Sequence, residues 1–333
     1  MTTILVENST WNNIGDGFYQ SALLAYLKEL FPTCEIRMGD GPIERAFRPS
    51  PRFVKNTFKL MDHEVADIHV FSGPMLRQLV PLYSTKIKEI IKSGRNYALI
   101  SCSGAGASKD EALAIGSLLQ EYPPIVLSSR DPETYERFGK YVDNAYNGIC
   151  AAFLVNKLPL SKVTAPKYFV SSFYSMPEPV FSSDKEHLDN IKDIDLSFRK
   201  PLIAHKYDRH LDFLRKHSGE LNGLNIVRAV HGVTDRFNHI NFGSPNSFLS
   251  FNPLAYLSLY QAAEFTISDR IHACAVSITL GRPARLFTKS PRAGIFDRLG
   301  IDYKATDGFM VPCPGRIDKE AKLMGDYLLE YIK

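Results

Sequence analysis

Short apolar runs alternate with longer amphipathic segments along the first half of the chain. Short apolar runs are typical of strands buried on both faces of a parallel sheet, and apolar residues at helical spacing indicate helices that cover such a sheet. The predicted strands are 2–8, 34–40, 66–73, 96–104 and 124–131. The predicted helices are 19–32, 53–65, 83–94, 108–122 and 132–140. This regular alternation favours an α/β domain with a parallel sheet.

The same alternation returns in the second half of the chain. Segment 171–193 is rich in Ser, Pro and Asp, which is typical of a long loop or a connection between domains. After it, the predicted strands are 200–208, 224–232, 264–267 and 284–288. The predicted helices are 209–223, 253–263, 319–333 and one that follows residues 268–270 and stops at Gly281. The repeated pattern predicts a second α/β domain.

Length and pattern together predict two domains. A chain of 333 residues is too long for one ordinary core. We predict a Rossmann-like domain at 1–160, a connection at 161–199 and a second Rossmann-like domain at 200–333, whose last helix packs back on the first domain. Both domains are doubly wound and face each other across a cleft, because ligands of open α/β sheets bind at the carboxyl ends of the strands.

The sequence SDRIHACA at 268–275 places an arginine and a histidine at the start of an otherwise apolar helix. Arg270 and His272 lie about 100° to either side of the apolar stripe, so they need not be buried in the core. A helix N-terminus attracts anions, and a guanidinium suits a phosphate or a carboxylate. His272 titrates near neutral pH, which makes it a candidate general acid or base. Alternatively, Arg270 pairs with Asp269 on the surface and His272 is a partly buried polar residue.

Arg130 holds the corresponding position in the first half. It ends a predicted strand, and Asp131 and Pro132 follow at the start of a helix. Taken alone, this arginine is explained most simply by a local ion pair. Because Arg270 stands at the equivalent position of the second domain, however, the two guanidinium groups can share one anion in the cleft.

Two glycine-containing turns precede helices of the first domain. Gly104 and Gly106 lie in a turn whose N–H groups can cradle a phosphate or a sugar hydroxyl, although it lacks the full dinucleotide or P-loop pattern and a tight turn needs no ligand. Asn13, Gly15 and Asp16 lie in the predicted turn 12–18 and precede the first helix. Asp16 either caps this helix or points with Asn13 into the cleft, where a polyol can form hydrogen bonds.

Composition and charge exclude several classes of function. The net charge of +4 is too small to indicate nucleic-acid binding. No apolar stretch reaches the roughly 18 residues of a membrane span, and the start MTTILVENST lacks the features of a signal peptide. Five cysteines without a CxxC pair indicate reduced thiols and no zinc site. We therefore expect a cytoplasmic protein without a metal.

Several segments resemble, in order, the motifs of the polysaccharide pyruvyl transferase family. They are NNIGDGF at 12–18, SGP at 72–74, SSRDPETYERFG at 128–139 with VDNAY at 142–146, and SDRIHACAVSITLGRPARLFTKSPRAGIFDRLGI at 268–301. The last segment is the most specific and includes Ile271 and Lys289. Many members carry a third glycine where this chain has SGP.

The resemblance implies a GT-B-like pair of domains and a pyruvyltransferase. Such an enzyme moves the enolpyruvyl group of phosphoenolpyruvate onto a sugar as a ketal and releases phosphate. Arg130 and Arg270 would neutralise charge in the transition state, and His272 would donate the proton or assist phosphate departure. Asn13, Asp16 and Asp143 would orient the acceptor or act as base on its hydroxyl. The predicted substrate-binding residues are Asn13, Gly15, Asp16, Gly104, Gly106, Asp143, Ile271 and Lys289.

The implied partners are phosphoenolpyruvate and a saccharide of a surface polysaccharide or exopolysaccharide, or its lipid-linked precursor. No cofactor is expected beyond the donor substrate. A lipid-linked acceptor would bring the protein to the inner face of the membrane, where the Lys/Arg-rich segment 86–95 would contribute weakly. No nucleic-acid partner is expected.

Two other functions remain open. A GT-B-like glycosyltransferase would use a nucleotide-sugar donor and would need a carboxylate for the ribose; Glu264, inside a predicted strand, is the one candidate. A non-catalytic protein would bind an anionic sugar in the same cleft. Stabilisation by phosphoenolpyruvate but not by nucleotide sugars distinguishes the first function from the others.

Overall fold

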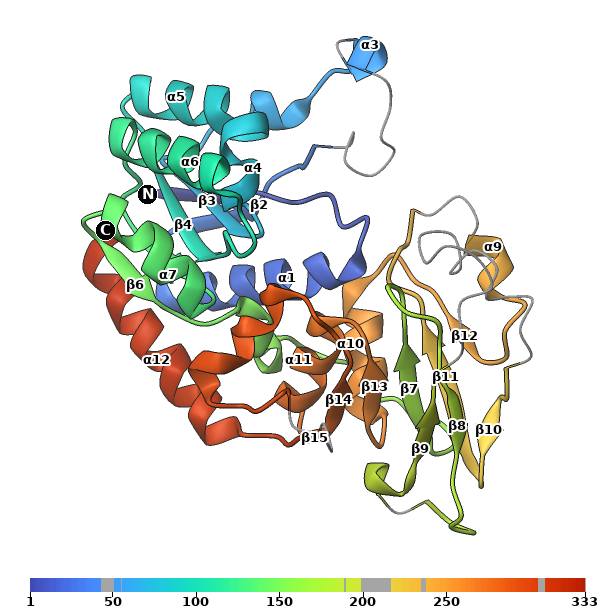
Figure 1. The fold of residues 1–333 in the computed structure, drawn as a ribbon. Coiled ribbons are helices and arrows are strands. Elements are labelled where there is room, and N and C mark those ends of the chain that lie inside the picture. Colours follow the sequence, from blue (N-terminus) through green and yellow to red (C-terminus); the bar gives the residue numbers. More distant parts are fainter. Residues whose placement is uncertain are drawn as a thin grey trace.

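The protein has one parallel and one mostly parallel sheet that stand side by side, with helices packed between and around them (Figure 1). The computed structural model describes residues 1–42, 51–54, 56–188, 190–198, 217–234, 238–304 and 309–332. The predicted α/β fold with two Rossmann-like sheets is confirmed. In the described part of the chain, no helix is long and apolar enough to cross a membrane.

The first sheet is entirely parallel and has the order β2-β1-β3-β4-β5-β6. Its strands are β1 (Thr3–Val6), β2 (Glu35–Met38), β3 (Ile68–Gly73), β4 (Asn96–Cys102), β5 (Leu127–Ser129) and β6 (Ala145–Asn147). The chain moves outward from β1 to β2 and then returns to place β3 on the other side of β1. This reversal opens a crevice at the carboxyl ends of β1 and β3, which is where such sheets bind ligands.

The first sheet is accompanied by helices, of which the first begins earlier than predicted: the segment 12–18 is not a turn, because Asn13 caps a helix that starts at Ile14. The helices are α1 (Ile14–Leu30), α3 (Pro51–Val54), α4 (Leu76–Gln78), α5 (Ser84–Lys92), α6 (Lys109–Glu121) and α7 (Pro132–Phe138). Shorter helical turns are η1 (Leu60–Asp62), the π-helix η2 (Leu79–Tyr83), η3 (Gly139–Tyr141) and η4 (Ala151–Lys157). Ser108 and Glu111 form a complete capping box at the start of α6.

The predicted helix 53–65 is wrong as a single element. Helix α3 ends at Val54, and only the short turn η1 follows. Asn56 and Thr57, which lie between these two elements, form helices weakly because their side chains compete for backbone hydrogen bonds. Phe58 and His63 instead stack their rings 4.9 Å apart, which holds the segment in a compact turn.

The second sheet has the order β10-β11-β7-β13-β14-β15, with β12 beside β11. Its strands are β7 (Tyr168–Ser172), β10 (Glu220–Leu221), β11 (Leu224–Ala229), β12 (Ser247–Phe248), β13 (Thr266–Ser268), β14 (Ala284–Leu286) and β15 (Phe309–Met310). Strands β11, β7, β13 and β14 are parallel, and β10 and β15 are antiparallel edges. A separate hairpin-like pair consists of β8 (Val180–Ser182) and β9 (Asp195–Ser197). The helices are η5 (Ile191–Asp193), α9 (Asn238–Asn241), α10 (Pro253–Ala262), α11 (Ile271–Thr279), η7 (Pro291–Leu299) and α12 (Pro314–Tyr331).

The second sheet takes a central strand from the segment 161–199 that we predicted as a connection. Strand β7 pairs with β11 on one side and β13 on the other, so this segment is not only a linker. The sequence hides the strand because the Ser- and Pro-rich stretch follows it directly. The predicted strand 200–208 and most of the predicted helix 209–223 lie outside the described residues, and the described end of that helix is the hairpin between β10 and β11.

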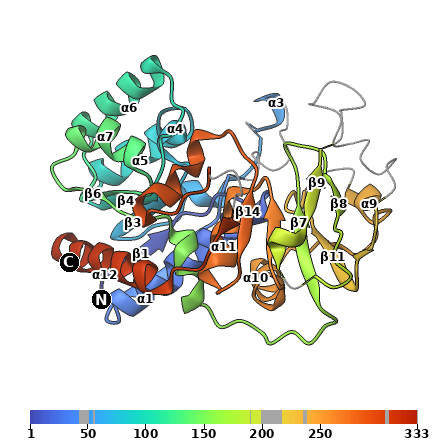
Figure 2. The same ribbon diagram turned by 60° about the horizontal axis from the view of Figure 1, so that its bottom comes forward.

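Helix α1 joins the two halves. Its buried residues point to all sides, which is typical of a helix enclosed by the core. It packs against η4, α10 and α11, and one continuous apolar core runs through both halves of the molecule. The last helix, α12, returns to α1, where the Tyr26 hydroxyl donates to the Ala321 carbonyl. The shared core fixes the start of α1 against the start of α11, so that a Cβ at Gly15 would lie 3.4 Å from Cβ of His272. The two helices lie next to each other between the sheets (Figure 2).

Candidate active site

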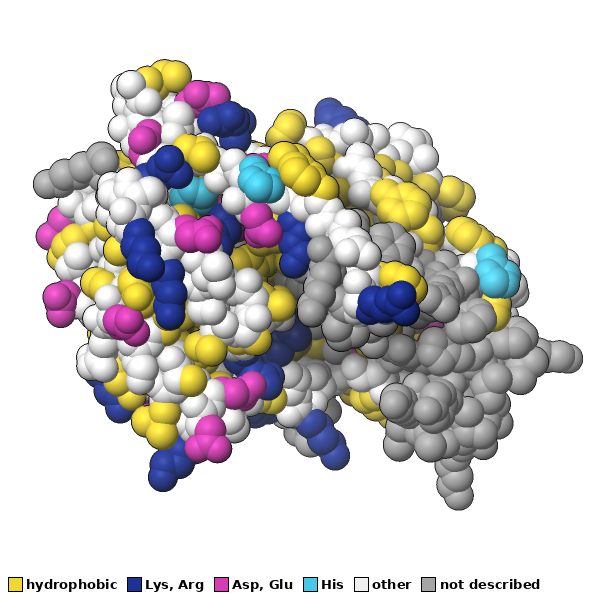
Figure 3. Space-filling view, turned by 90° about the horizontal axis from the view of Figure 1, so that it is seen from above, with side chains coloured by type: hydrophobic (Ala, Val, Ile, Leu, Met, Phe, Trp, Pro, Cys, Tyr) yellow, Lys and Arg dark blue, Asp and Glu magenta, His cyan; other side chains and the backbone are white. Residues whose placement is uncertain are grey.

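A cavity of about 220 Å³ lies where the carboxyl ends of strands from both sheets meet. Basic side chains are visible in the hollow between the two halves when the molecule is seen from above (Figure 3). Of the predicted site residues, the cavity is lined by Asn13, Gly15, Arg130, Arg270, Ile271 and His272. It is also lined by residues that the sequence did not single out as site residues, namely Tyr174, Ser175, His231, Asp269, Thr288, Ser290 and Arg292.

Arg130 is buried at the end of β5, with only 1% of its surface exposed. Its Nε and Nη1 atoms have no hydrogen-bond partner among the described residues. The neighbouring Asp131 forms no ion pair with it among the described contacts: Oδ1 of Asp131 accepts the backbone N–H of Thr134 at 2.8 Å and so caps α7, and its Oδ2 has no hydrogen-bond partner among the described residues. A buried guanidinium with unpaired donors is costly, and an anionic ligand is able to satisfy those donors.

Arg270 is the residue that precedes the first turn of α11. Its Nη1 donates to Oδ1 of Asn13 at 3.3 Å, and its guanidinium lies 4.4 Å from the ring centre of Tyr174. Its Nε has no hydrogen-bond partner in the described part of the chain. Both contacts are neutral, so they do not balance the charge of Arg270. Burial lowers the pKa of this guanidinium, and the nearby charge of Asp269 opposes the effect.

The alternative surface pair between Arg270 and Asp269 is not what the structure shows. The Asp269 carboxylate accepts backbone N–H groups of Tyr174, Ser175 and Met176 at 2.6–3.1 Å. Desolvation raises the pKa of Asp269 above its ordinary value, and the charge of Arg270 and these hydrogen bonds only partly oppose this shift. Asp269 therefore holds the loop that follows β7 beside the cavity.

His272 is buried, with 7% of its surface exposed, although the helical pattern did not require burial. It packs against Tyr19, with ring centres 5.3 Å apart, and its Nε2 lies 3.9 Å from Sγ of Cys150. Desolvation and the charges of Arg130 and Arg292 hold its pKa well below the ordinary range, while a hydrogen bond with the Gly15 backbone opposes them. These effects favour the neutral imidazole, and an anion that neutralises the arginines would raise its proton affinity.

Arg292 is a third arginine, which the sequence did not single out. It lies in the first turn of η7, exposed at the rim of the cavity. Desolvation by the surrounding protein and the charge of Arg130 lower the pKa of Arg292, and the charge of Asp16 opposes this shift. Asp16 itself is buried in the first turn of α1 and does not line the cavity. Its carboxylate thus supports Arg292.

Other predicted residues lie away from the cavity. The Gly104 N–H donates to the Thr134 hydroxyl at 2.9 Å, and that of Gly106 donates to Glu133 at 3.3 Å, so neither is directed at a ligand. Gly104 is needed because a Cβ there would collide with the ring of Phe138. Asp143 is exposed before β6, at the amino edge of the sheet and not at the carboxyl edge.

Lys289 is exposed between two residues that line the cavity, Thr288 and Ser290. It therefore lies near the rim without lining the site. Lys86, from the basic segment considered for membrane contact, is buried and lies 2.6 Å from Oε1 of Glu7. Because Lys86 forms a buried ion pair with Glu7, it does not contact an external surface.

The cavity thus combines three arginines, a neutral histidine and the N-terminus of α11. No carboxylate of the described residues forms an ion pair with Arg130 or Arg270 at the cavity. Charge-assisted hydrogen bonds from arginine forks suit carboxylates and phosphates. The arrangement is built to receive a compact anion with more than one negatively charged group, beside a histidine that is able to exchange a proton.

Comparison with known proteins identifies the family of the chain. The family model described as polysaccharide pyruvyl transferase matches residues 13–291. No curated protein matches the chain in sequence.

Solved structures confirm the GT-B-like arrangement of the fold. A Listeria monocytogenes protein assigned as a UDP-N-acetylglucosamine 2-epimerase has a TM-score of 0.54 at 8% identity, covering 99% of this chain and 91% of that one. The UDP-GlcNAc 2-epimerase of Neisseria meningitidis, bound to UDP-GlcNAc, has a TM-score of 0.50 at 10% identity, covering 99% and 100%. That of Rickettsia bellii has a TM-score of 0.50 at 11% identity, covering 98% and 88%. Identities this low show the fold alone.

Proposed function

Because the chain belongs to the polysaccharide pyruvyl transferase family, we propose that it moves the enolpyruvyl group of phosphoenolpyruvate onto a saccharide as a ketal and releases phosphate. The observation that carries this proposal is the pair of arginines at the cavity: Nε and Nη1 of the buried Arg130 and Nε of the half-buried Arg270 have no hydrogen-bond partner among the described residues. Phosphoenolpyruvate carries a carboxylate and a phosphate close together, and each matches an arginine fork. Arg292 at the rim adds a third positive charge.

His272 supplies the proton that the reaction needs. Donor binding neutralises Arg130 and Arg292, two charges that keep the pKa of His272 low, so the imidazole becomes protonated as the donor binds. The proton passes to the methylene carbon of the donor or to the departing phosphate, and both roles require the imidazolium form. His272 is thereby charged only when substrate is present.

The bonds and protons of the reaction balance. Protonation of the methylene carbon makes the neighbouring C2 electrophilic, and one sugar hydroxyl adds to it. The bond between C2 and the phosphate oxygen breaks, and a second hydroxyl closes the cyclic ketal. Of the two protons released by the hydroxyls, one restores His272 and the other leaves to solvent or phosphate. Arg130 and Arg270 stabilise the negative charge that develops on the leaving phosphate.

Asn13 and Asp16 act as positioning residues in this proposal. Asn13 holds Arg270 through its amide oxygen, and the charge of Asp16 acts on Arg292. The proposed reaction uses no metal and no further cofactor, because the arginines supply the positive charge that it requires. Asp143 is left without a role, since it lies at the opposite edge of the sheet.

The acceptor in this proposal is a saccharide of a surface polysaccharide or exopolysaccharide, free or as a lipid-linked precursor. The protein would then work in the cytoplasm, at the inner face of the membrane when the acceptor is lipid-linked. A nucleotide-sugar donor is disfavoured because Glu264, the one candidate for a ribose contact, is exposed next to the amino end of β13, at the far edge from the cavity.

Phosphate release from phosphoenolpyruvate tests the proposal, with a panel of β-galactosides, β-glucosides and lipids that contain N-acetylmannosamine. We expect acceptor-dependent release by the wild type and loss of it in His272→Ala. His63→Ala, which removes an exposed histidine stacked on Phe58, is the matched control and should keep full activity. No release with any acceptor, together with no binding of phosphoenolpyruvate, would instead favour the glycosyltransferase.

A further inference from the structure

The loop between β7 and β8 carries an aromatic side chain at the mouth of the cavity. Tyr174 lines the cavity and covers the guanidinium of Arg270, with 4.4 Å from Cζ to the ring centre. The residue nevertheless keeps 41% of its surface exposed. Since one face of the ring rests on Arg270, the accessible surface faces away from the arginine. A neutral aromatic surface therefore adjoins the anion site.

The first half of this loop is anchored to the cavity floor. The two oxygens of Asp269 accept the N–H of Tyr174 at 3.0 and 3.1 Å, and Oδ2 also accepts those of Ser175 at 2.6 Å and Met176 at 2.8 Å. Asp269 directly precedes Arg270, so one short segment of chain places both the arginine and the ring that covers it.

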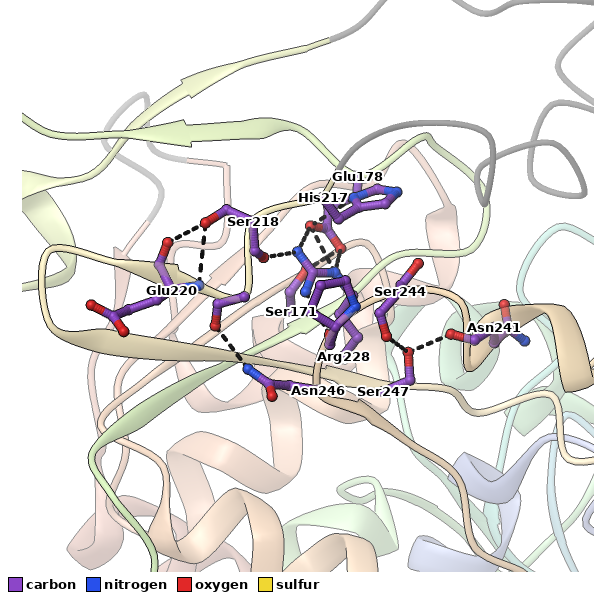
Figure 4. Close-up of polar contacts among 12 residues, drawn as sticks. Ser171, Glu178, His217, Ser218, Glu220, Arg228, Asn241, Ser244, Asn246 and Ser247 are labelled. Atoms are coloured by element: carbon purple, nitrogen blue, oxygen red, sulfur yellow. Dashed lines mark hydrogen bonds and ion pairs between the residues drawn. The ribbon is translucent and has the colours of Figure 1, made fainter.

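The second half of the loop is anchored to the sheet. Glu178 is buried and binds Arg228 of β11 through several hydrogen bonds of 2.7–3.2 Å (Figure 4). The Ser171 hydroxyl of β7 donates to the same carboxylate at 3.1 Å. With both halves fixed, the ring of Tyr174 is held in place before any ligand binds, which lowers the entropy cost of binding against it.

We propose that Tyr174 is the platform for the acceptor sugar: one face of its ring clamps Arg270, and the exposed part receives the C–H face of a pyranose ring. This inference rests on the proposed pyruvyltransferase function. The donor is anionic and takes the arginines, so a neutral aromatic surface beside them suits the neutral co-substrate. The C–H groups of a sugar are weakly positive and lie against the negative face of an aromatic ring.

The position of the platform also suits the chemistry. Ketal formation needs two hydroxyls of one sugar next to C2 of the donor, and a rigid contact that orients the sugar ring aligns both of them. Ser175 follows Tyr174 in the cavity lining and offers a hydroxyl to the rim of the sugar. Tyr174 thus selects acceptors that present an unsubstituted C–H face beside the reacting diol.

Saturation-transfer NMR with methyl β-D-galactoside, methyl β-D-glucoside and N-acetylmannosamine tests the platform directly, and calorimetry measures phosphoenolpyruvate binding on the same proteins. We expect Tyr174→Ala to weaken sugar binding about tenfold and Tyr174→Phe to retain it, because the ring and not the hydroxyl makes the contact. Tyr135→Ala, which removes a tyrosine on α7 that is 37% exposed, is the matched control and should bind as the wild type does.

The outcomes separate the platform from the transferase. Unchanged sugar binding in Tyr174→Ala, with weaker phosphoenolpyruvate binding, would make the ring a clamp for Arg270 alone and overturn the platform. Binding of none of the three sugars to the wild type would overturn it as well. Failure of the transferase shows separately, as absence of phosphate release, because sugar binding is measured without turnover.

Discussion

Two buried arginines, Arg130 and Arg228, are held in opposite ways. Arg228 is 7% exposed, and its donors are used by the Glu178 carboxylate and by the carbonyls of Pro245 and Ser218, each at 2.8 Å. Arg130 is 1% exposed, yet its Nε and Nη1 have no partner among the described residues. Burial of a charge alone does not distinguish the two arginines. Unpaired donors at the cavity do, because an anionic ligand is able to satisfy them.

The largest effect is expected where the paired arginine loses its carboxylate. Glu178→Ala leaves Arg228 buried and uncompensated, so the free energy of unfolding should fall by about 3–5 kcal/mol. Urea denaturation measures the loss. The double variant Glu178→Ala/Arg228→Met removes both charges and should recover a large part of it. A loss below about 1 kcal/mol in the single variant would mean that Arg228 finds another partner and that the comparison does not hold.

The unpaired arginine should behave in the opposite way. Arg130→Met removes a buried charge whose Nε and Nη1 have no partner among the described residues, so stability without ligand should stay constant or rise. Phosphate release should nevertheless fall by a factor of about 10² to 10³, because the lost donors act on charge that develops in the transition state. Arg137→Met on α7 is the matched control and should retain activity. Clear destabilisation by Arg130→Met would show that the arginine is structural, as Arg228 is.

The sequence predicted the unpaired arginines better than the paired one. Arg130 and Arg270 were found because each follows a buried strand, and the carboxyl ends of parallel strands meet at one edge of a sheet. Arg228 lies inside β11, and its partner Glu178 is 50 residues away in a loop that no periodicity describes. Pairing across such a distance depends on tertiary contacts and leaves no local signal.

The same reason explains what was missed at the cavity. Tyr174 meets Asp269 across 95 residues, inside a segment that looked like a connection between domains. Arg292 stands in a short helix after β14, where no alternation marks it, although it falls within the segment 268–301 that carries the family resemblance. Gly104 had the composition of an anion-binding turn, but its N–H is taken by a side chain of α7. Local patterns placed the elements, and packing decided which of them face the ligand.

Stabilisation of the folded protein by phosphoenolpyruvate should depend on Arg130. A ligand present at 100 times its Kd stabilises the folded protein by about 2.7 kcal/mol when it binds only that state. We expect phosphoenolpyruvate to raise the unfolding free energy of the wild type by this amount and to have no such effect on Arg130→Met. Equal stabilisation of both proteins would place the anion elsewhere. The control variant Arg137→Met, at a half-buried arginine on α7, should respond as the wild type does.

The stability contributions of His272 at the cavity and of the Glu178–Arg228 pair should be lost at different pH values. Desolvation, Arg130 and Arg292 hold the folded pKa of His272 well below its ordinary value of 6.5, so below that pH the unfolded chain binds a proton that the folded chain does not. Stability therefore falls as the pH drops below 6.5. The hydrogen bond from His217 and the charge of Arg228 outweigh desolvation and lower the folded pKa of Glu178. The contribution of Glu178 to stability is therefore fully present above its ordinary pKa of 4.5 and is lost as the pH falls through its lower pKa in the folded protein.

This last prediction is the smallest, at most about 1.4 kcal/mol per pH unit for each histidine. In urea titrations between pH 6.5 and 5.5, His272→Gln should reduce the slope of stability against pH, leaving the share of His231, whose pKa burial also lowers. Glu178→Gln should leave the slope unchanged in that window. Saturating inorganic phosphate should flatten the wild-type slope, because an anion beside the arginines lets the folded protein take up the same proton. If phosphate leaves the wild-type slope unchanged, the arginines do not control the protonation of His272, and the proton step of the proposed reaction is wrong.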